Sequence, residues 1–218
     1  MKMLQQMKSK LRKAALALAV VALPLFTPSQ ATAGLILSDN FDTAPLQLNW
    51  PGDSVFDSLG TNLLGQTIST DLIGNPGFFN FLPGNGRYVD LDGSTGNGDD
   101  PAGILRSKAT FGAGDYTLSF RLAGNQRGQT PRFTDVFLGN DLIASLLPAA
   151  NAPFTLYSFN FSSAGGKLIF SQRGPSNQQG NLLDDVNLSV PEPSTITLIA
   201  MALLSMFGLG MMRRRAEV

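Results

Sequence analysis

The chain of 218 residues contains no cysteine and no histidine. The missing cysteine excludes disulfides and a thiol nucleophile, and the missing histidine excludes a Ser-His-Asp triad and a histidine-ligated zinc site. Glycan hydrolysis by two aspartates is still open, because it needs only one protonated and one ionised carboxyl group. The adjacent or near-adjacent acids that allow it are Asp90/Asp92, Asp99/Asp100 and Asp184/Asp185. Aspartate is also common in turns, and we therefore expect a protein that is not an enzyme.

The middle of the chain is short of positive charge and of strong helix formers. Residues 34–190 contain no glutamate, only two lysines, and 14 acidic against 8 basic residues, which gives a net charge of −6. A nucleic-acid partner would need a basic surface, and anionic lipid head groups would need one as well, so neither is expected. Frequent Gly, Asn, Asp and Ser residues favour strands and turns over helices.

The first 33 residues have the order of a secretory signal peptide. Five basic residues within positions 2–13 precede an apolar run at 14–26, and Ala31-Thr32-Ala33 supplies small residues for signal peptidase. The apolar run is shorter than a membrane span usually is. We predict cleavage after Ala33, with a retained N-terminal anchor as the alternative.

The last part of the chain predicts a transmembrane helix at 195–212. These 18 residues carry no charge, and at about 1.5 Å of rise per residue they approach the thickness of a bilayer core. Arg213, Arg214 and Arg215 follow as a basic stop that should stay in the cytoplasm. Pro191 and Pro193 keep the preceding chain extended, in a form that a protease can bind. The physics of this tail fits a plain C-terminal anchor and a cleavable sorting signal equally well.

The segment 190–218 resembles a known sorting signal. Val190-Pro191-Glu192-Pro193, the apolar span and the terminal arginines are similar, in order and spacing, to the PEP-CTERM signal of Gram-negative bacteria. This resemblance implies recognition of Pro191, Glu192 and Pro193 by exosortase, a membrane-embedded cysteine transpeptidase. It also implies an exported, membrane-anchored precursor that is delivered to the cell surface or the extracellular matrix, in organisms that commonly make exopolysaccharide.

Residues 34–190 match the size of a single domain and read as an all-β fold. Alternation is clearest at 115–122, where Tyr116, Leu118 and Phe120 share one face. Gly139-Asn140-Asp141 between two short apolar runs predicts a hairpin. We expect a two-sheet antiparallel sandwich, with its clearest strands at 35–41, 87–92, 104–111, 115–122, 133–138, 142–146, 154–161, 167–171 and 182–190. Residues 42–77 give a weaker signal.

Three short motifs in this domain resemble those of a galactose-binding-like jelly roll, the fold of many carbohydrate-binding modules. They are Gly86-Arg87-Tyr88-Val89-Asp90-Leu91-Asp92-Gly93, Gly114-Asp115-Tyr116-Thr117-Leu118-Ser119-Phe120 and Leu182-Leu183-Asp184-Asp185-Val186. The resemblance implies a structural calcium held by Asp42 and Asp185, with Asp39 and Asp184 as alternates. The family usually has glutamate where this chain has Asp42. A hydrogen-bonded turn acid is the alternative for each of them.

A sugar site needs an aromatic plane and neighbouring polar groups. Trp50 is the only tryptophan, and Asn49, Asn125, Arg127 and Arg132 are the polar residues that we expect beside a sugar. Packing of Trp50 over the edge of the sandwich is the alternative. The sequence thus predicts an exported surface or matrix protein that binds polysaccharide. A purely structural or adhesive matrix protein and an aspartate-dependent glycan hydrolase remain as alternatives.

Overall fold

The computed structural model describes residues 34–58, 60–61, 67–77, 79–94, 102–128, 130–174 and 176–191. They fall within one compact unit, residues 33–191. Pro191 is exposed and is the last described residue. The predicted signal peptide, Glu192, Pro193, the apolar span at 195–212 and Arg213–Arg215 lie outside the described residues. Within the described ranges, no helix is long and apolar enough to cross a membrane.

The described residues form two antiparallel sheets and one short strand pair. The larger sheet has the order β12-β9-β14-β7-β6-β2, with β1 also paired to β14, and the smaller sheet has the order β11-β10-β13-β8-β3. The elements are β1 Gly34–Asp39, β2 Gln47–Trp50, β3 Phe56–Asp57, β4 Gly60–Thr61, β5 Thr67–Ile68, β6 Thr70–Gly74, β7 Arg87–Asp90, β8 Ile104–Ser107, β9 Gly114–Ala123, β10 Thr134–Leu138, β11 Asp141–Leu146, β12 Thr155–Ser163, β13 Leu168–Gln172 and β14 Leu182–Val190.

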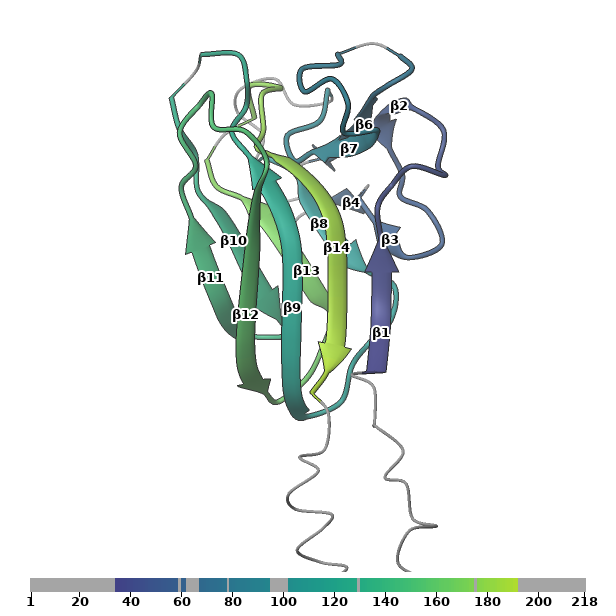
Figure 1. Ribbon diagram of the computed structural model, residues 1–218, viewed down its shortest axis with the longest axis vertical. Coiled ribbons are helices and arrows are strands. Elements are labelled where there is room, and N and C mark those ends of the chain that lie inside the picture. The colour runs from purple at the N-terminus through teal and green to yellow at the C-terminus, as the bar shows by residue number, and fades with distance from the viewer. Residues whose placement is uncertain are drawn as a thin grey trace, which may run out of the picture. The chain divides into compact units, whose positions relative to one another are not determined.

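The chain passes repeatedly from one sheet to the other. β8 lies in the smaller sheet, β9 in the larger one, β10 and β11 in the smaller, β12 in the larger, β13 in the smaller and β14 in the larger. Figure 1 shows the two layers, with β12, β9, β14 and β1 side by side in one of them. This alternation is how a jelly-roll sandwich is built. The all-β, two-sheet antiparallel fold expected from the sequence is confirmed.

The core lies between the sheets and follows from the alternation of apolar residues. Leu118, Phe120 and Leu122 of β9 are fully buried, and Phe170 of β13 meets Phe120 edge-on across the core, with 5.1 Å between the ring centroids. Burying each such side chain contributes roughly 1.5–3 kcal/mol relative to leaving it exposed. Because the domain has no disulfide, this apolar core carries its stability.

Several predicted boundaries are confirmed, and others are not. The strand at 182–190 is β14, and the hairpin around Gly139 is the β10–β11 pair, in which Leu138 faces Asp141. The strand expected at 104–111 ends earlier, at Ser107. β2 and β6 were only weakly indicated, because both lie in the weakly patterned stretch 42–77.

The segment that contains β7 is buried on both faces. Val89 faces the core, and Tyr88, Asp90 and Asp92 are buried as well. Loop residues Phe81, Leu82 and Phe154 cover Tyr88 in a second apolar cluster with Ile73, Ala123 and Leu182. The carboxylates on this covered face belong to the site described next.

Candidate functional site

A pocket of about 200 Å³ opens at the end of the sandwich where β6, β7 and four loops meet. We call it the loop-end pocket. It is smaller than the roughly 300–1,000 Å³ typical of sites for drug-sized ligands, so it suits one small unit and not a long chain segment. It is lined by Asp71, Ile73, Phe79, Asp90, Ser94, Arg127, Asn177, Gln178 and Gln179.

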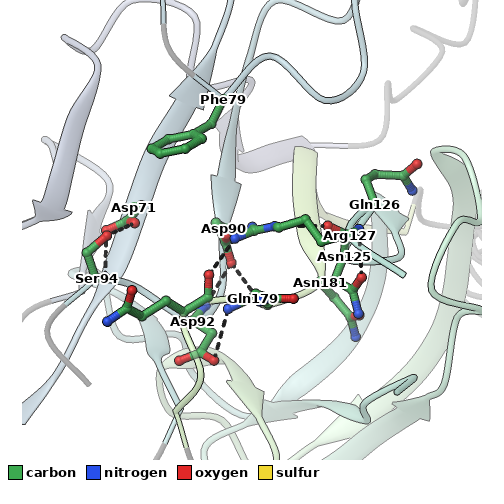
Figure 2. A network of polar contacts seen from close by, with 12 residues as sticks. Asp71, Phe79, Asp90, Asp92, Ser94, Asn125, Gln126, Arg127, Gln179 and Asn181 are labelled. Carbon is green, nitrogen blue, oxygen red and sulfur yellow. Dashed lines mark hydrogen bonds and ion pairs between the residues drawn. The ribbon is translucent and has the colours of Figure 1, made fainter. Parts of the chain in front are cut away.

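Strand register places two carboxylates in this pocket. β6 and β7 are antiparallel, and Asp71 is directly opposite Asp90, so both side chains project to the same face of the sheet. Asp71 is buried, and its Oδ1 accepts hydrogen bonds from the backbone N–H groups of Asn49 at 2.7 Å and Ser94 at 3.0 Å. Its Oδ2 accepts the Ser94 hydroxyl at 2.6 Å. Figure 2 shows the Asp71–Ser94 pair on one side and the Asp90–Arg127 pair on the other.

Asp90 is paired with Arg127. The guanidinium forms an ion pair with Asp90 Oδ2, while Asp90 Oδ1 accepts the backbone N–H groups of Gly180 at 2.7 Å and Asp92 at 3.1 Å. Burial raises the pKa of Asp90 to about 7, and the Arg127 charge and the Asp92 N–H act in the opposite direction. Asp90 therefore fastens two loops to β7.

Arg127 is held from three other sides. Its Nε donates to the Asn125 carbonyl at 3.2 Å, and its Nη1 donates to the Gln178 carbonyl. The guanidinium also lies 4.6 Å above the centre of the Phe81 ring. A cation over an aromatic face is attracted to it, which adds a further restraint on the arginine.

The loop 176–180 is fixed by Asp92. This carboxylate is 1% exposed, and its Oδ2 accepts the backbone N–H groups of Asn177 at 2.8 Å and Gln179 at 3.3 Å. Gly180 lies so close that a Cβ added to it would fall 2.3 Å from the Asp92 nitrogen, so only glycine fits there. Gln179 Oε1, by contrast, is buried and has no hydrogen-bond partner.

Phe79 supplies an exposed aromatic surface to this pocket. Its side chain is 51% exposed, it stacks on Phe81 with ring centroids 5.9 Å apart, and its φ is +56°. Left-handed φ values are unfavourable for non-glycine residues, and strain of this kind concentrates at functional sites. Asn49, Gln126 and Gln178, which contact or adjoin the same pocket, also have positive φ.

The expected aromatic residue of the sugar site was the wrong one. Trp50 is 1% exposed and packs edge-on against Phe41, with 6.0 Å between ring centroids, so it offers no face for a sugar to stack on. Trp50 pairs with Thr70 of β6, and this register turns the indole into the core. The alternative, in which Trp50 packs over the edge of the sandwich, is nearer to the structure, which buries the indole in the core.

Of the polar residues expected beside a sugar, some lie at the loop-end pocket and others do not. Arg127 lines the loop-end pocket, and buried Asn125 holds it in place. Asn49 contributes its backbone N–H to Asp71, whereas its side-chain Oδ1 accepts the Ser69 hydroxyl. Arg132 does not line the pocket, and its carbonyl accepts Asn181 Nδ2 at 2.8 Å.

Sequence reasoning missed Phe79, Asp71, Ser94 and Gln179. One signal was present, since Asn75-Pro76-Gly77-Phe78-Phe79-Asn80-Phe81 combines turn residues with three phenylalanines. An aromatic cluster in a turn-rich segment is a good candidate for a binding loop. Nothing comparable marks Gln179, because only the fold brings it to the pocket.

A second pocket, of about 640 Å³, lies beside the first strand. We call it the first-strand pocket, and its acidic lining residues are Asp39, Asp53 and Asp185. Burial and the neighbouring Asp53 carboxyl raise the pKa of Asp39 to about 7. Asp39 Oδ1 accepts the Phe41 N–H at 2.8 Å, but the buried Oδ2 has no partner. The described residues that line this pocket include no basic side chain.

The four aspartates expected to hold calcium do not all converge. Asp39 and Asp185 line the first-strand pocket, whereas Asp42 accepts the Arg87 N–H at 2.8 Å. Asp184 is buried beside Arg121, at 4.0 Å, and burial together with the Asp185 charge raises its pKa to about 7. Within the described part of the chain, no three acidic side chains gather closely enough to hold a metal ion by themselves. The unpartnered Asp39 oxygen and the nearby Asp53 carboxyl nevertheless fit a cation that completes its shell with backbone oxygens and water.

Comparison with known proteins identifies the fold. No protein-family model matches the sequence, and no curated protein matches it. The K3 cleaved adhesin domain of Lys-gingipain from Porphyromonas gingivalis has a TM-score of 0.50 at 15% identity, covering 72% of this chain and 99% of that one. The K2 cleaved adhesin domain of Lys-gingipain has a TM-score of 0.50 at 14% identity, covering 71% and 99%. The CBM22-1 xylan-binding domain from Paenibacillus barcinonensis has a TM-score of 0.43 at 11% identity, covering 75% and 98%. At these identities the two adhesin domains establish a common fold and nothing more.

Proposed function

We propose that this protein is an exported surface or matrix component that binds polysaccharide without catalysing a reaction. The observation that carries the proposal is Phe79, a half-exposed aromatic ring held at a polar pocket in a strained backbone conformation. Sugars bind to such sites by stacking an apolar ring face on the aromatic plane while their hydroxyls meet polar groups. The surrounding loops are fastened by Asp90 and Asp92, so the site is largely formed before a ligand arrives.

The test is retention of the purified protein on an array of polysaccharides, with Phe79→Ala as the variant. We expect Phe79→Ala to lose about tenfold or more in affinity, since an aromatic contact of this size contributes on the order of 1–2 kcal/mol. Phe133→Ala is the matched control, because Phe133 is likewise an exposed phenylalanine but does not line the pocket. Absence of binding to every polymer would support a purely structural or adhesive protein instead.

A glycan hydrolase is less well supported by the two acid pairs that the structure describes, whereas the third pair, Asp99/Asp100, lies outside the described residues. Asp90 and Asp92 are buried and engaged by backbone N–H groups, so neither is placed to protonate a leaving group or to activate water. Asp184 is also buried, and its neighbours are Asp185 and Arg121. Release of reducing sugar from a bound polymer, lost in the Asp184→Asn variant, would favour the hydrolase.

Delivery to the surface is proposed from the C-terminal segment. Pro191, Glu192 and Pro193 would be recognised by exosortase, the apolar span at 195–212 would hold the precursor in the membrane, and Arg213–Arg215 would stay in the cytoplasm. Signal peptidase would remove residues 1–33. Mass spectrometry of exported material tests this, because processing predicts a chain that begins at Gly34 and ends near Pro191.

A structural calcium belongs to the same proposal. Asp39 and Asp53, with Asp185 at the pocket wall, are the residues that would hold the ion in the first-strand pocket. When bound, calcium would neutralise two neighbouring carboxylates and join β1 to the segment that follows β2. An increase in thermal midpoint on adding calcium, reversed by a chelator, tests the site.

A further inference from the structure

The guanidinium of Arg127 is already engaged within the protein. Its Nε, Nη1 and Nη2 each donate one hydrogen bond, to the Asn125 carbonyl, the Gln178 carbonyl and Asp90 respectively. One face of the guanidinium is covered by the Phe81 ring. Two of its five N–H groups, one on each Nη, are left over, but its positive charge is already matched by the Asp90 carboxylate. Arg127, the only basic residue lining the pocket among the described residues, therefore organises the site and brings no unmatched positive charge to an anion.

The polar atoms of the pocket that have hydrogen-bonding capacity to spare are acceptors. Gln179 Oε1 is buried without a partner, and Asp71 Oδ2 accepts the hydroxyl of Ser94 and has a further lone pair. Because Ser94 donates its proton to Asp71, its own oxygen is left with lone pairs to accept another hydrogen bond. A ligand that satisfies these atoms must bring donors of its own, as hydroxyl groups do.

The charges of the pocket also disfavour a negatively charged ligand. Arg127 is matched by Asp90, which leaves the charge of Asp71 without a basic counterpart among the described lining residues. Residues 34–190 as a whole carry a net charge of −6. A uronate or a sulfate ester placed here would meet a like charge and an acceptor lone pair, and both contacts are repulsive.

We infer that the loop-end pocket takes an uncharged, hydroxyl-rich sugar unit that stacks on Phe79 and donates hydroxyl protons to Gln179 Oε1 and Asp71 Oδ2. This inference rests on the proposed function, and it adds the chemical class of the ligand. It excludes acidic polysaccharides, whether their charge comes from carboxylate, sulfate or phosphate groups. Arg127 is a positioning residue in this site.

The experiment compares polymers that differ in charge alone. The processed, exported protein is tested against polygalacturonate and its methyl ester, and against dextran and dextran sulfate, alongside uncharged galactans, glucans and xylans. We expect binding to at least one uncharged polymer, little dependence on salt, and at least about tenfold weaker binding to the charged member of each pair. Tighter binding to polygalacturonate than to its ester, or to dextran sulfate than to dextran, overturns the inference and leaves the proposed function standing. Absence of binding to any polymer overturns both.

Two variants assign the effect to this pocket. Gln179→Met removes the unpartnered acceptor while keeping a similar length, and it should weaken binding to the uncharged polymer by about fivefold. Gln47→Met is the control, because Gln47 is exposed and lines the other pocket. Asp71→Asn should narrow the difference between the charged and uncharged members of each pair, which a merely structural role would not do. If both pocket variants keep their thermal midpoint and the wild-type binding profile, the inference is wrong, because the sugar then binds elsewhere.

Discussion

The two pockets of this domain are both lined by aspartates, yet the aspartates are in opposite situations. In the loop-end pocket, Asp71 accepts N–H and hydroxyl donors and Asp90 has both backbone N–H groups and Arg127. In the first-strand pocket, Asp39 faces another carboxyl, Asp53, and one of its oxygens has no partner. The loop-end pocket needs no bound metal ion and exposes an aromatic ring. The carboxylates of the first-strand pocket are stabilised only when they gain a proton or a bound cation. The partners of a carboxylate, and not its presence, decide what a pocket can bind.

The largest expected effect comes from removing the positive charge of Arg127 from the loop-end pocket. Arg127→Ala would leave Asp90 buried without a counter-charge, and we expect a loss of about 3–5 kcal/mol in the free energy of unfolding, measured by urea denaturation. Arg173→Ala is the control, since Arg173 makes a two-pronged pair with Asp135 but is exposed, so its removal should cost much less. Equal losses for the two variants would show that Asp90 does not depend on its partner.

A smaller effect, on the pH dependence of stability, is expected from the first-strand pocket. The pKa of Asp39 is raised to about 7 from an ordinary value of 3.8, so the folded state holds a proton that the unfolded state has already released. Stability without calcium should therefore fall as the pH rises from about 4 to about 7, and Asp90 and Asp184 act in the same direction. For Asp39, which is only partly buried, we expect about 1 kcal/mol after allowance for solvent screening.

The measurement is the free energy of unfolding at about pH 5 and about pH 8, with and without calcium. Asp39→Asn should remove its part of the pH dependence and also the stabilisation by calcium at the higher pH. If the variant responds to calcium as the wild type does, the ion does not bind at Asp39.

The smallest expected effect comes from removing one hydrogen bond in the loop-end pocket. Ser94→Ala removes the hydroxyl that donates to Asp71 Oδ2 at 2.6 Å, and we expect a loss of about 1 kcal/mol in stability together with weaker glycan binding. Ser54→Ala, in the wall of the first-strand pocket, is the matched control. A change in binding with Ser54→Ala alone would reverse the assignment of the glycan to the loop-end pocket.

Much of the fold was predictable because its strands are buried on one side only. The alternation of Tyr116, Leu118 and Phe120 identified β9, and the run from Leu182 to Val190 identified β14, since a period of two is visible in a strand with one solvated face. β6 gave only a weak signal, for the opposite reason. All five of its residues are buried, so it has no polar face to create an alternation.

The candidate site was predictable only in part. Asn125 and Arg127, both expected near a sugar, lie close together, because polar loops between strands tend to gather at one end of a sandwich. Arg127 lines the loop-end pocket, and Asn125 accepts its backbone N–H. The position of Trp50 was predicted wrongly because the neighbouring asparagine and proline suggested a loop. Trp50 is in fact the last residue of β2, and its indole points into the core. Phe79 was missed because the turn-rich, aromatic segment 75–81 does not by itself indicate which phenylalanine lines a pocket, and only the fold decides that.

The sequence by itself determined the class of this protein: an acidic, cysteine-free, all-β domain between two segments that predict export and anchoring. Those features depend on composition and local period, which are read along the chain. Only the tertiary structure decided which aspartates meet Arg127 and which meet one another, because Asp71, Asp90, Arg127 and Gln179 come from four separate segments. Strand register brings the first two together, and the loops then place an arginine already paired with Asp90 and an unpartnered amide oxygen beside them. The chemistry of the pocket is therefore a property of the fold.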